Sequence, residues 1–116
     1  MHEMGLATEI VRIVTESIPG DVADPKVVRV NLKVGRLAAV VPQSLTFCFE
    51  IAAKDGPVEG AELYIEEIGV SARCNDCAHL WDIDAPAFQC PKCNSGSIEM
   101  LTGRELDIES IELAGE

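Results

Sequence analysis

Aromatic residues and long apolar runs are scarce in this chain of 116 residues. It holds only three Phe, one Tyr and one Trp, although 47% of its residues are hydrophobic. The interior must therefore consist mainly of Val, Ile, Leu and Ala. No stretch approaches the roughly 18–20 uninterrupted apolar residues of a transmembrane helix, so the sequence predicts no membrane span. The length suits one ordinary domain, or one small domain with a lobe held together by a metal.

Basic residues are also few. Nine Lys and Arg residues stand against 20 Asp and Glu residues, which gives a formal net charge of −11 at pH 7. Because basic charge supplies most of the affinity for nucleic acid, this balance disfavours a nucleic-acid partner. Protein partners or cations fit an acidic surface better.

The patterns expected of several other protein classes are missing. A secretory signal is not visible, because the apolar positions near the start are interrupted by Thr8, Glu9 and Arg12. There is no nucleophile paired with a base, no glycine-rich phosphate-binding motif and no open metal site for catalysis. The sequence predicts a binding or transfer protein and not an enzyme.

Against these absences stand four cysteines in two close pairs. Cys74 and Cys77 form the first pair, and Cys90 and Cys93 form the second, with twelve residues between the pairs. Two residues between cysteines allow a tight turn that directs both sulfur atoms at one point, and two such turns supply four thiolates to a tetrahedral metal. Because sulfur would fill all four positions, the pattern predicts a structural zinc site.

Two disulfides, a redox-active dithiol or an iron site of the rubredoxin type are the alternatives for these cysteines. Disulfides require an oxidising compartment, and a thioredoxin-like motif has a single pair beside a βαβ unit. Spacing alone does not exclude iron. The fifth cysteine, Cys48, lies among apolar residues of a predicted helix, and we expect it to be a buried, inert thiol.

The spacing of apolar residues predicts five segments of regular structure. Steps of three and four residues predict an amphipathic helix over residues 6–18, and a second helix that begins at Pro42 and ends before residues 54–57. Alternation of apolar and polar residues predicts a strand over residues 28–34. The same alternation predicts two further strands, over residues 61–70 and 106–113.

The alternation slips in both of the last two strands. The slip lies between Ile65 and Ile68 in the first and between Ile108 and Ile111 in the second. Matching slips in the two segments that flank the cysteines favour an antiparallel pair with facing bulges. The cysteines would then lie at the tip of a long hairpin.

Together these patterns predict an α+β fold. Two helices would pack on a three-stranded sheet, and a four-cysteine zinc-ribbon lobe would be inserted between the last two strands. Residues 1–69 and 101–116 would form one domain, and residues 70–100 would form the lobe. A lobe of this size is too small to bury a core of its own, so the metal would hold it together.

The first three residues, Met1, His2 and Glu3, form a candidate second metal site. The terminal amine, the backbone nitrogen of His2 and its imidazole can close fused chelate rings around one ion. The backbone nitrogen or the side chain of Glu3 would add a fourth donor. Nitrogen donors in one plane suit Ni(II) or Cu(II) better than zinc, because these ions favour square-planar coordination. By itself, a lone histidine near a chain terminus usually has no metal role.

Several motifs occur together along essentially the whole chain. They are Met1-His2-Glu3, Leu32-Lys33-Val34-Gly35, Ser44-Leu45-Thr46-Phe47-Cys48-Phe49-Glu50, Val58-Glu59-Gly60-Ala61, the set Cys74, Cys77, Cys90 and Cys93, and Leu106-Asp107-Ile108. In this combination the chain resembles the HypA/HybF family of hydrogenase nickel-incorporation proteins. Paired cysteines are common to many families, whereas their combination with Met-His-Glu at the start is specific.

The resemblance implies a cytoplasmic nickel metallochaperone for the maturation of [NiFe]-hydrogenase and, in some organisms, of urease. It implies Ni(II) binding through Met1, His2 and Glu3, and zinc binding through the four cysteines. The implied partners are a nickel-handling GTPase of the HypB type, the precursor of the hydrogenase large subunit and, where urease is served, urease maturation proteins. Some members couple the two metals through histidines beside the cysteine pairs. His79 stands at a different place relative to Cys77, so that role is not transferred to it.

Two other functions compete with this one. An acidic zinc-ribbon adaptor that mediates protein–protein contacts would use the same four cysteines without nickel. An electron carrier would hold iron in the four-cysteine site, and the purified protein would then show a red visible absorption band.

Overall fold

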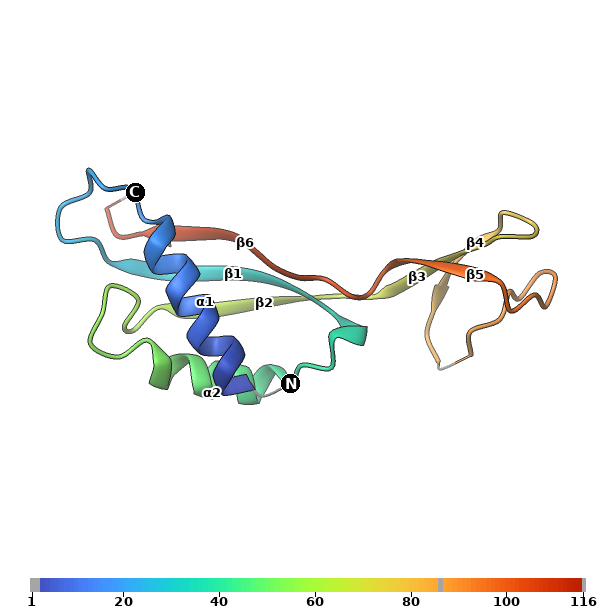
Figure 1. Cartoon of the computed structure of the whole chain (residues 1–116), viewed down its shortest axis with the longest axis horizontal. Coiled ribbons are helices and arrows are strands. Elements are labelled where there is room, and N and C mark those ends of the chain that lie inside the picture. The colour runs from blue at the N-terminus through green and yellow to red at the C-terminus, as the bar shows by residue number, and fades with distance from the viewer. Residues whose placement is uncertain (1–2, 86, 116) are drawn as a thin grey trace. The chain divides into compact units, whose positions relative to one another are not determined.

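A computed structural model describes residues 3–85 and 87–115 of the chain. Its elements, in chain order, are α1 (Glu3–Ser17), β1 (Val27–Gly35), the 3-10 helix η1 (Arg36–Ala38), α2 (Pro42–Ala52), β2 (Glu62–Ile68), β3 (Val70–Cys74), β4 (Leu80–Ile83), β5 (Ile98–Thr102) and β6 (Leu106–Leu113). Figure 1 labels the helices and strands along the chain. Within the described residues, no helix is long and apolar enough to cross a bilayer.

The chain folds as two compact units. The first, here called the helical unit, comprises Met1–Lys33, Ala39–Glu66 and Asp107–Glu116. The second, here called the cysteine unit, comprises Val34–Ala38 and Glu67–Leu106.

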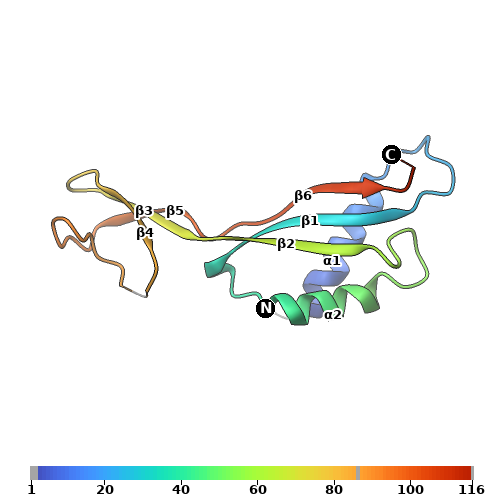
Figure 2. The same ribbon diagram turned by 180° about the vertical axis from the view of Figure 1, so that it is seen from behind.

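A three-stranded sheet with the order β2-β1-β6 forms one layer of the helical unit. In Figure 1, β1 and β2 point the same way and β6 points the opposite way. α1 crosses this sheet in front of it in Figure 1 and behind it in Figure 2, and α2 runs below β2 in both views. This arrangement confirms the predicted α+β class, with two helices packed on three strands and the cysteines inserted between the second and the last of them.

The core of the helical unit is mainly aliphatic, as the scarcity of aromatic residues predicts. Side chains at most 4% exposed come from α1 (Ala7, Ile10, Val14), β1 (Val27, Val30, Leu32) and α2 (Leu45, Phe49). α1 begins three residues before the predicted start, and the buried residues of both helices recur at three- and four-residue steps. Apolar periodicity therefore located both helices.

One part of the predicted topology is wrong. β2 and β6 do not pair with each other, because β1 lies between them. β1 is the most buried of the three strands and takes the central place, where both of its edges are paired. Antiparallel pairing instead occurs nearer the cysteines, between β3 and β5, with a register shift between Ser71 and Ala72. The slips read from the sequence lie within β2 and β6, where two consecutive residues are exposed, and neither slip coincides with the register shift between β3 and β5.

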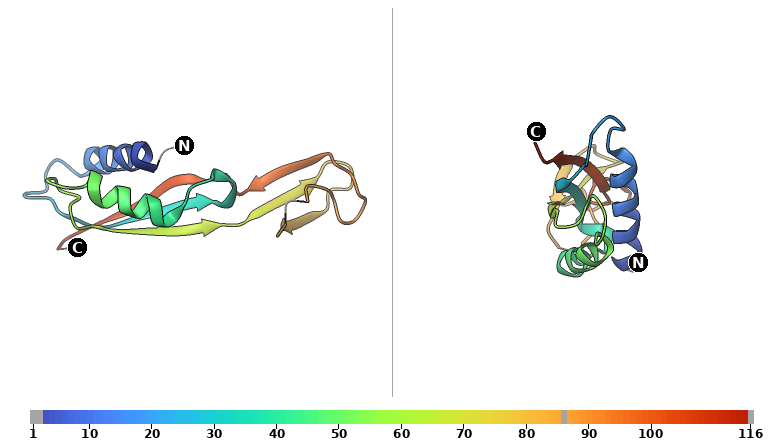
Figure 3. Two further views of the ribbon diagram at one scale, coloured as in Figure 1. Left: turned by 90° about the horizontal axis from the view of Figure 1, so that it is seen from below. Right: turned by 90° about the vertical axis from the view of Figure 1, so that its left-hand side faces the viewer.

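The cysteine unit contains a second three-stranded sheet, with the order β4-β3-β5 (Figure 3). β3 pairs antiparallel with both neighbours. A buried cluster in this unit consists of Val70, Ala72 and Ile83, with the half-buried side chains Trp81, Ile98 and Met100 packed against it. Apolar burial in this unit is slight, so another interaction must contribute to its stability.

Two glycines allow a close backbone contact within the cysteine unit. The N–H of Gly35 donates to the carbonyl oxygen of Glu105 at 2.7 Å, and the N–H of Leu37 donates to that of Gly103 at 2.6 Å. A Cβ at Gly35 would lie 2.2 Å from the carbonyl carbon and oxygen of Gly103. Gly103 itself has φ +119°, which favours glycine. The end of β1 is thereby joined to the segment between β5 and β6.

We expect Gly35→Ala to lower the free energy of unfolding by about 1–3 kcal/mol, because the new methyl group would overlap backbone atoms that cannot rotate away. Urea denaturation followed by circular dichroism measures this change. Gly5→Ala is the matched control, since nothing lies within 4 Å of its added Cβ. In a helix, alanine is more favourable than glycine by about 0.8–1.0 kcal/mol. Equal stability of Gly35→Ala and the wild type would contradict the close contact.

Candidate metal centres

Two turns of the same design present the four cysteines. In the first turn, the N–H of Ala78 donates to the carbonyl oxygen of Cys74, and the N–H of Cys74 donates to that of His79, both at 2.9 Å. Ala78 adopts φ +64°. This conformation reverses the chain, so that Cys77 is directed back toward Cys74.

The second turn repeats this pattern around Cys90. The N–H of Asn94 donates to the carbonyl oxygen of Cys90 at 2.8 Å, and the N–H of Cys90 donates to that of Ser95 at 2.9 Å. Asn94 has φ +62°, in the region that asparagine tolerates better than most residues. The equal spacing of the two cysteine pairs therefore reflects two equivalent turns.

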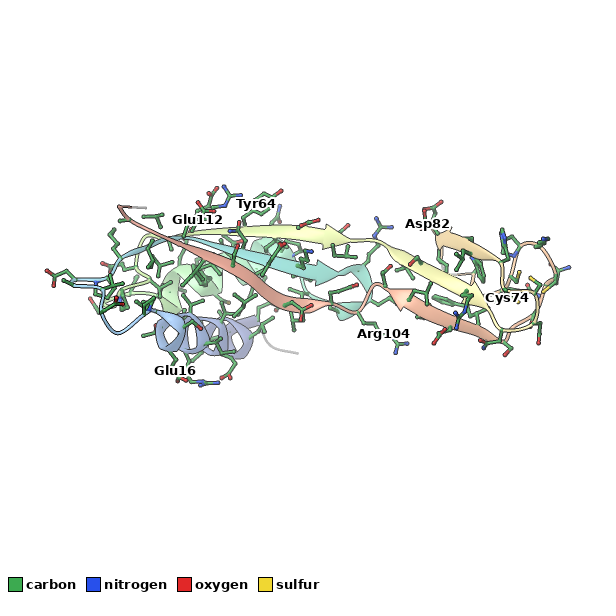
Figure 4. All side chains as sticks on the ribbon, turned by 90° about the horizontal axis from the view of Figure 1, so that it is seen from above. Glu16, Tyr64, Cys74, Asp82, Arg104 and Glu112 are labelled. Carbon is green, nitrogen blue, oxygen red and sulfur yellow. The ribbon has the colours of Figure 1, made fainter. Side chains whose placement is uncertain are left out.

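The four sulfur atoms converge on one point, as the spacing predicts. The Sγ atoms of Cys74, Cys77, Cys90 and Cys93 all lie within 4.8 Å of one another. The distance from Cys74 to Cys93 is 3.5 Å and that from Cys77 to Cys90 is 3.6 Å. Figure 4 shows sulfur atoms gathered beside the labelled Cys74. The sequence thus identified a cluster whose members are up to 19 residues apart.

These distances fit a tetrahedral metal and exclude disulfides. Four sulfur atoms bound at about 2.3 Å to one tetrahedral zinc lie about 3.8 Å apart, close to the separations found here. A disulfide requires sulfur atoms at about 2.05 Å, and all five cysteines are free. A Zn²⁺ ion bound by Cys74, Cys77, Cys90 and Cys93 would have no open position. Such a site supplies structural cross-linking and no catalytic chemistry.

Backbone groups prepare the cysteines for a metal. The N–H groups of Asp76 and Cys77 each donate to Sγ of Cys74 at 3.4 Å. Burial raises the pKa of Cys74, but these donors outweigh it and bring the pKa down to about 7. For Cys93, the Ser95 N–H lowers the pKa, but the neighbouring thiols, Cys74 foremost, and burial raise it to about 12. Thiols this close cannot all ionise unless a cation lies among them, and a divalent metal provides that charge.

Side chains outside the cysteine set connect the two turns. The hydroxyl of Ser95 donates to the carboxylate of Asp76. The amide of Asn75 donates to the hydroxyl of Ser97 at 3.2 Å. The sequence analysis did not single out this pair of contacts, because Ser and Asn are equally common in turns that bind no metal. The ring of His79 stacks on that of Trp81, with centroids 5.8 Å apart.

The predicted nickel site falls mostly outside the described residues. Met1 and His2 lie there, whereas Glu3 is the first residue of α1. The carboxylate of Glu3 lies at the start of α2, 3.5 Å from the backbone nitrogen of Val41 and 3.4 Å from Oγ of Ser44. Ser44 is 41 residues away in the chain, and no local pattern predicts this contact.

Cys48 takes no part in the sulfur cluster. It is half-buried in α2 and not fully buried as predicted. It lies on the helix between the buried side, which carries Leu45 and Phe49, and the side that carries the exposed Ile51.

Comparison with known proteins gives a consistent picture. Residues 1–113 match the family described as hydrogenase/urease nickel incorporation, metallochaperone, hypA. The chain is 56% identical over 113 residues to the hydrogenase maturation factor HypA of Desulfosudis oleivorans, covering 97% of this chain and 98% of that one. It is 52% identical over 114 residues to HypA of Desulfatibacillum aliphaticivorans, covering 98% and 88%.

Two solved structures share the fold. One is the solution structure of the Ni metallochaperone HypA from Helicobacter pylori, with a TM-score of 0.68 and 25% identity over the whole of both chains. The other is a solution structure of a HypA protein, with a TM-score of 0.74 and 26% identity over 100% of this chain and 98% of that one.

We expect Cys74→Ser to abolish tight zinc binding and to loosen β3, β4 and β5, because three thiolates leave the metal with an open position and the unit has little other core. Elemental analysis would report the zinc, and amide hydrogen exchange would report the loosening. Cys48→Ser is the matched control and should keep a full zinc complement. Zinc retained by Cys74→Ser at the wild-type level would contradict the four-sulfur site.

Proposed function

Because the chain belongs to the HypA family of hydrogenase and urease nickel-incorporation metallochaperones, we propose that it binds Ni(II) through Met1, His2 and Glu3 and delivers it to the precursor of the hydrogenase large subunit. Members of this family are maturation factors, not enzymes. The family match over residues 1–113 is the observation that carries the proposal. The adaptor alternative has no comparable observation in its favour.

Two metals would have separate tasks. The cysteines offer four sulfur donors to zinc, which leaves no position for exchange and makes this site structural. Nickel, the cargo, must be taken up and released, so it requires a different donor set. We propose that residues 1–69 and 101–116 serve nickel binding and that residues 70–100 hold zinc.

The chemistry of the first three residues suits a transferable ion. The amine of Met1, the backbone nitrogen and imidazole of His2 and a donor from Glu3 can surround Ni(II) in a plane. A chelate made by so few residues can be displaced by an acceptor that offers more donors. The sequence has no nucleotide-binding motif, so the free energy for directed release would come from a partner.

We propose that this partner is a nickel-handling GTPase of the HypB type in the cytoplasm, with urease maturation proteins as further clients in organisms that need them. Charge favours protein partners over nucleic acid. Carboxylates already engage five of the nine basic side chains, namely Arg12, Arg29, Lys33, Arg36 and Arg73. Arg29 contacts Glu112 and stacks over the ring of Tyr64, both labelled in Figure 4. Little positive charge remains for phosphate groups.

We expect a pull-down with the full-length protein to recover the HypB-type GTPase, with association slowed by salt if charges steer the encounter. A matched titration with duplex DNA and with RNA at physiological salt should show no tight binding. Sub-micromolar affinity for either nucleic acid would contradict this assignment of partners.

We expect His2→Ala to abolish specific Ni(II) binding, because it removes the imidazole donor. Zinc content and helical circular dichroism should stay unchanged. Isothermal titration of untagged protein measures the binding. Affinity should also fall as pH drops through about 8 to 6, since the amine and imidazole must be deprotonated and their ordinary pKa values are about 7.7–8.0 and 6.5.

A residue fused before Met1 is an independent check of the same site. It converts the amine to an amide while every side chain remains, and it should weaken or remodel nickel binding. Nickel affinity that is undiminished in His2→Ala would place the site elsewhere, with His79 the next histidine to test.

A further inference from the structure

We propose that Ser44 is a positioning residue for the nickel site. With the backbone N–H of Val41, its hydroxyl holds the carboxylate of Glu3 at the start of α2 and so anchors the first turn of α1. The proposal rests on the proposed function, since it assumes that nickel binds at residues 1–3. The side chain of Glu3 then serves as the anchor, and the metal is left to the other donors of the segment.

Both contacts come from one carboxylate. Oε1 of Glu3 accepts from Oγ of Ser44 at 3.4 Å, and Oε2 accepts from the nitrogen of Val41 at 3.5 Å. These distances lie at the outer limit of hydrogen bonding, but the acceptor carries a full charge, which strengthens such bonds. The two oxygens have different donors, so the carboxylate is fixed in direction as well as in place.

The start of α2 has no capping side chain at its own N-cap position, and this carboxylate takes that role. The N-cap residue, Val41, has no side chain that can accept a hydrogen bond, and Pro42 follows it at the first helical position. In a capping box, the side chain of the third helical residue accepts from the N–H of the N-cap residue. Here Ser44 occupies that third position, and Glu3 from the other helix accepts from both groups. The cap is therefore supplied through tertiary structure.

The electrostatics of both helices favour the same arrangement. The first turn of a helix carries a partial positive charge, which attracts anions. Glu3 is the first residue of α1, and its carboxylate also lies at the first turn of α2. One negative charge thus serves two helix starts. Because Glu3 directly follows Met1 and His2 in the chain, the anchor would fix the point from which these two proposed nickel-binding residues extend.

Three variants separate an anchor from a general effect on α2. Ser44→Ala removes the hydroxyl, and Ser44→Thr retains one. Thr46→Ala is the matched control, because the hydroxyl of Thr46 belongs to the same helix but donates to the carbonyl oxygen of Pro42 at 2.9 Å. Two readouts apply to each variant: exchange of the Val41 amide hydrogen in nickel-free protein, and the rate at which bound Ni(II) is lost to a chelator.

We expect Ser44→Ala to speed both Val41 exchange and nickel loss by about three- to tenfold, the size of effect that follows from losing one helix cap. Ser44→Thr and Thr46→Ala should behave as the wild type does, and zinc content should not change in any variant. Unchanged Val41 exchange in Ser44→Ala would overturn the anchor. Equal acceleration by Thr46→Ala would also overturn it, because the effect would then come from fraying of α2.

The two proposals fail in different ways. If Ser44→Ala speeds Val41 exchange but leaves nickel loss unchanged, the positioning role is wrong while the nickel site stands. If His2→Ala keeps full nickel affinity, the nickel site itself is wrong, and Val41 exchange still decides whether Ser44 holds Glu3.

Discussion

The cysteine unit depends on the close approach of four sulfur atoms, which all lie within 4.8 Å of one another. Neighbouring thiolates repel, so the cluster can be fully ionised only around a cation. A divalent ion would remove that repulsion and join two turns whose adjacent cysteines are 19 (Cys74 and Cys93) and 13 (Cys77 and Cys90) residues apart in the chain. Among the described residues of this unit, the buried hydrophobic side chains other than cysteines are Val34, Val70, Ala72 and Ile83. Metal coordination would thus do for the cysteine unit what aliphatic packing does for the helical unit.

A closed sulfur site also constrains where the cargo can bind. An ion held by four thiolates exchanges slowly and serves structure, whereas a metallochaperone must release its metal. In our proposal, separate donor chemistry would solve this conflict, with sulfur for zinc and planar nitrogen for nickel. The helical unit then has a specific task. We propose that the Glu3 carboxylate, held at the start of α2, fixes the point from which the proposed nickel-binding segment extends.

The sequence correctly predicted the features that depend on the spacing of nearby residues in the chain. Apolar periodicity located α1, β1 and α2, and the spacing of the cysteines located the cluster of four sulfur atoms. Local spacing could not identify contacts between distant segments. The apolar alternation of β2 and β6 predicted which of their side chains share a face of the sheet. It did not predict the neighbouring strand, which is β1 for both. The contact of Gly35 with Gly103 and that of Glu3 with Ser44 join segments far apart in the chain, and no periodic pattern marks them.

The central claim is that two metals occupy two chemically different sites. X-ray absorption at the nickel and zinc edges of one sample loaded with both metals tests it most directly. The account predicts a zinc shell of four sulfur atoms at about 2.3 Å and a nickel shell of nitrogen or oxygen atoms without sulfur. Sulfur in the nickel shell, or nitrogen in the zinc shell, would contradict it.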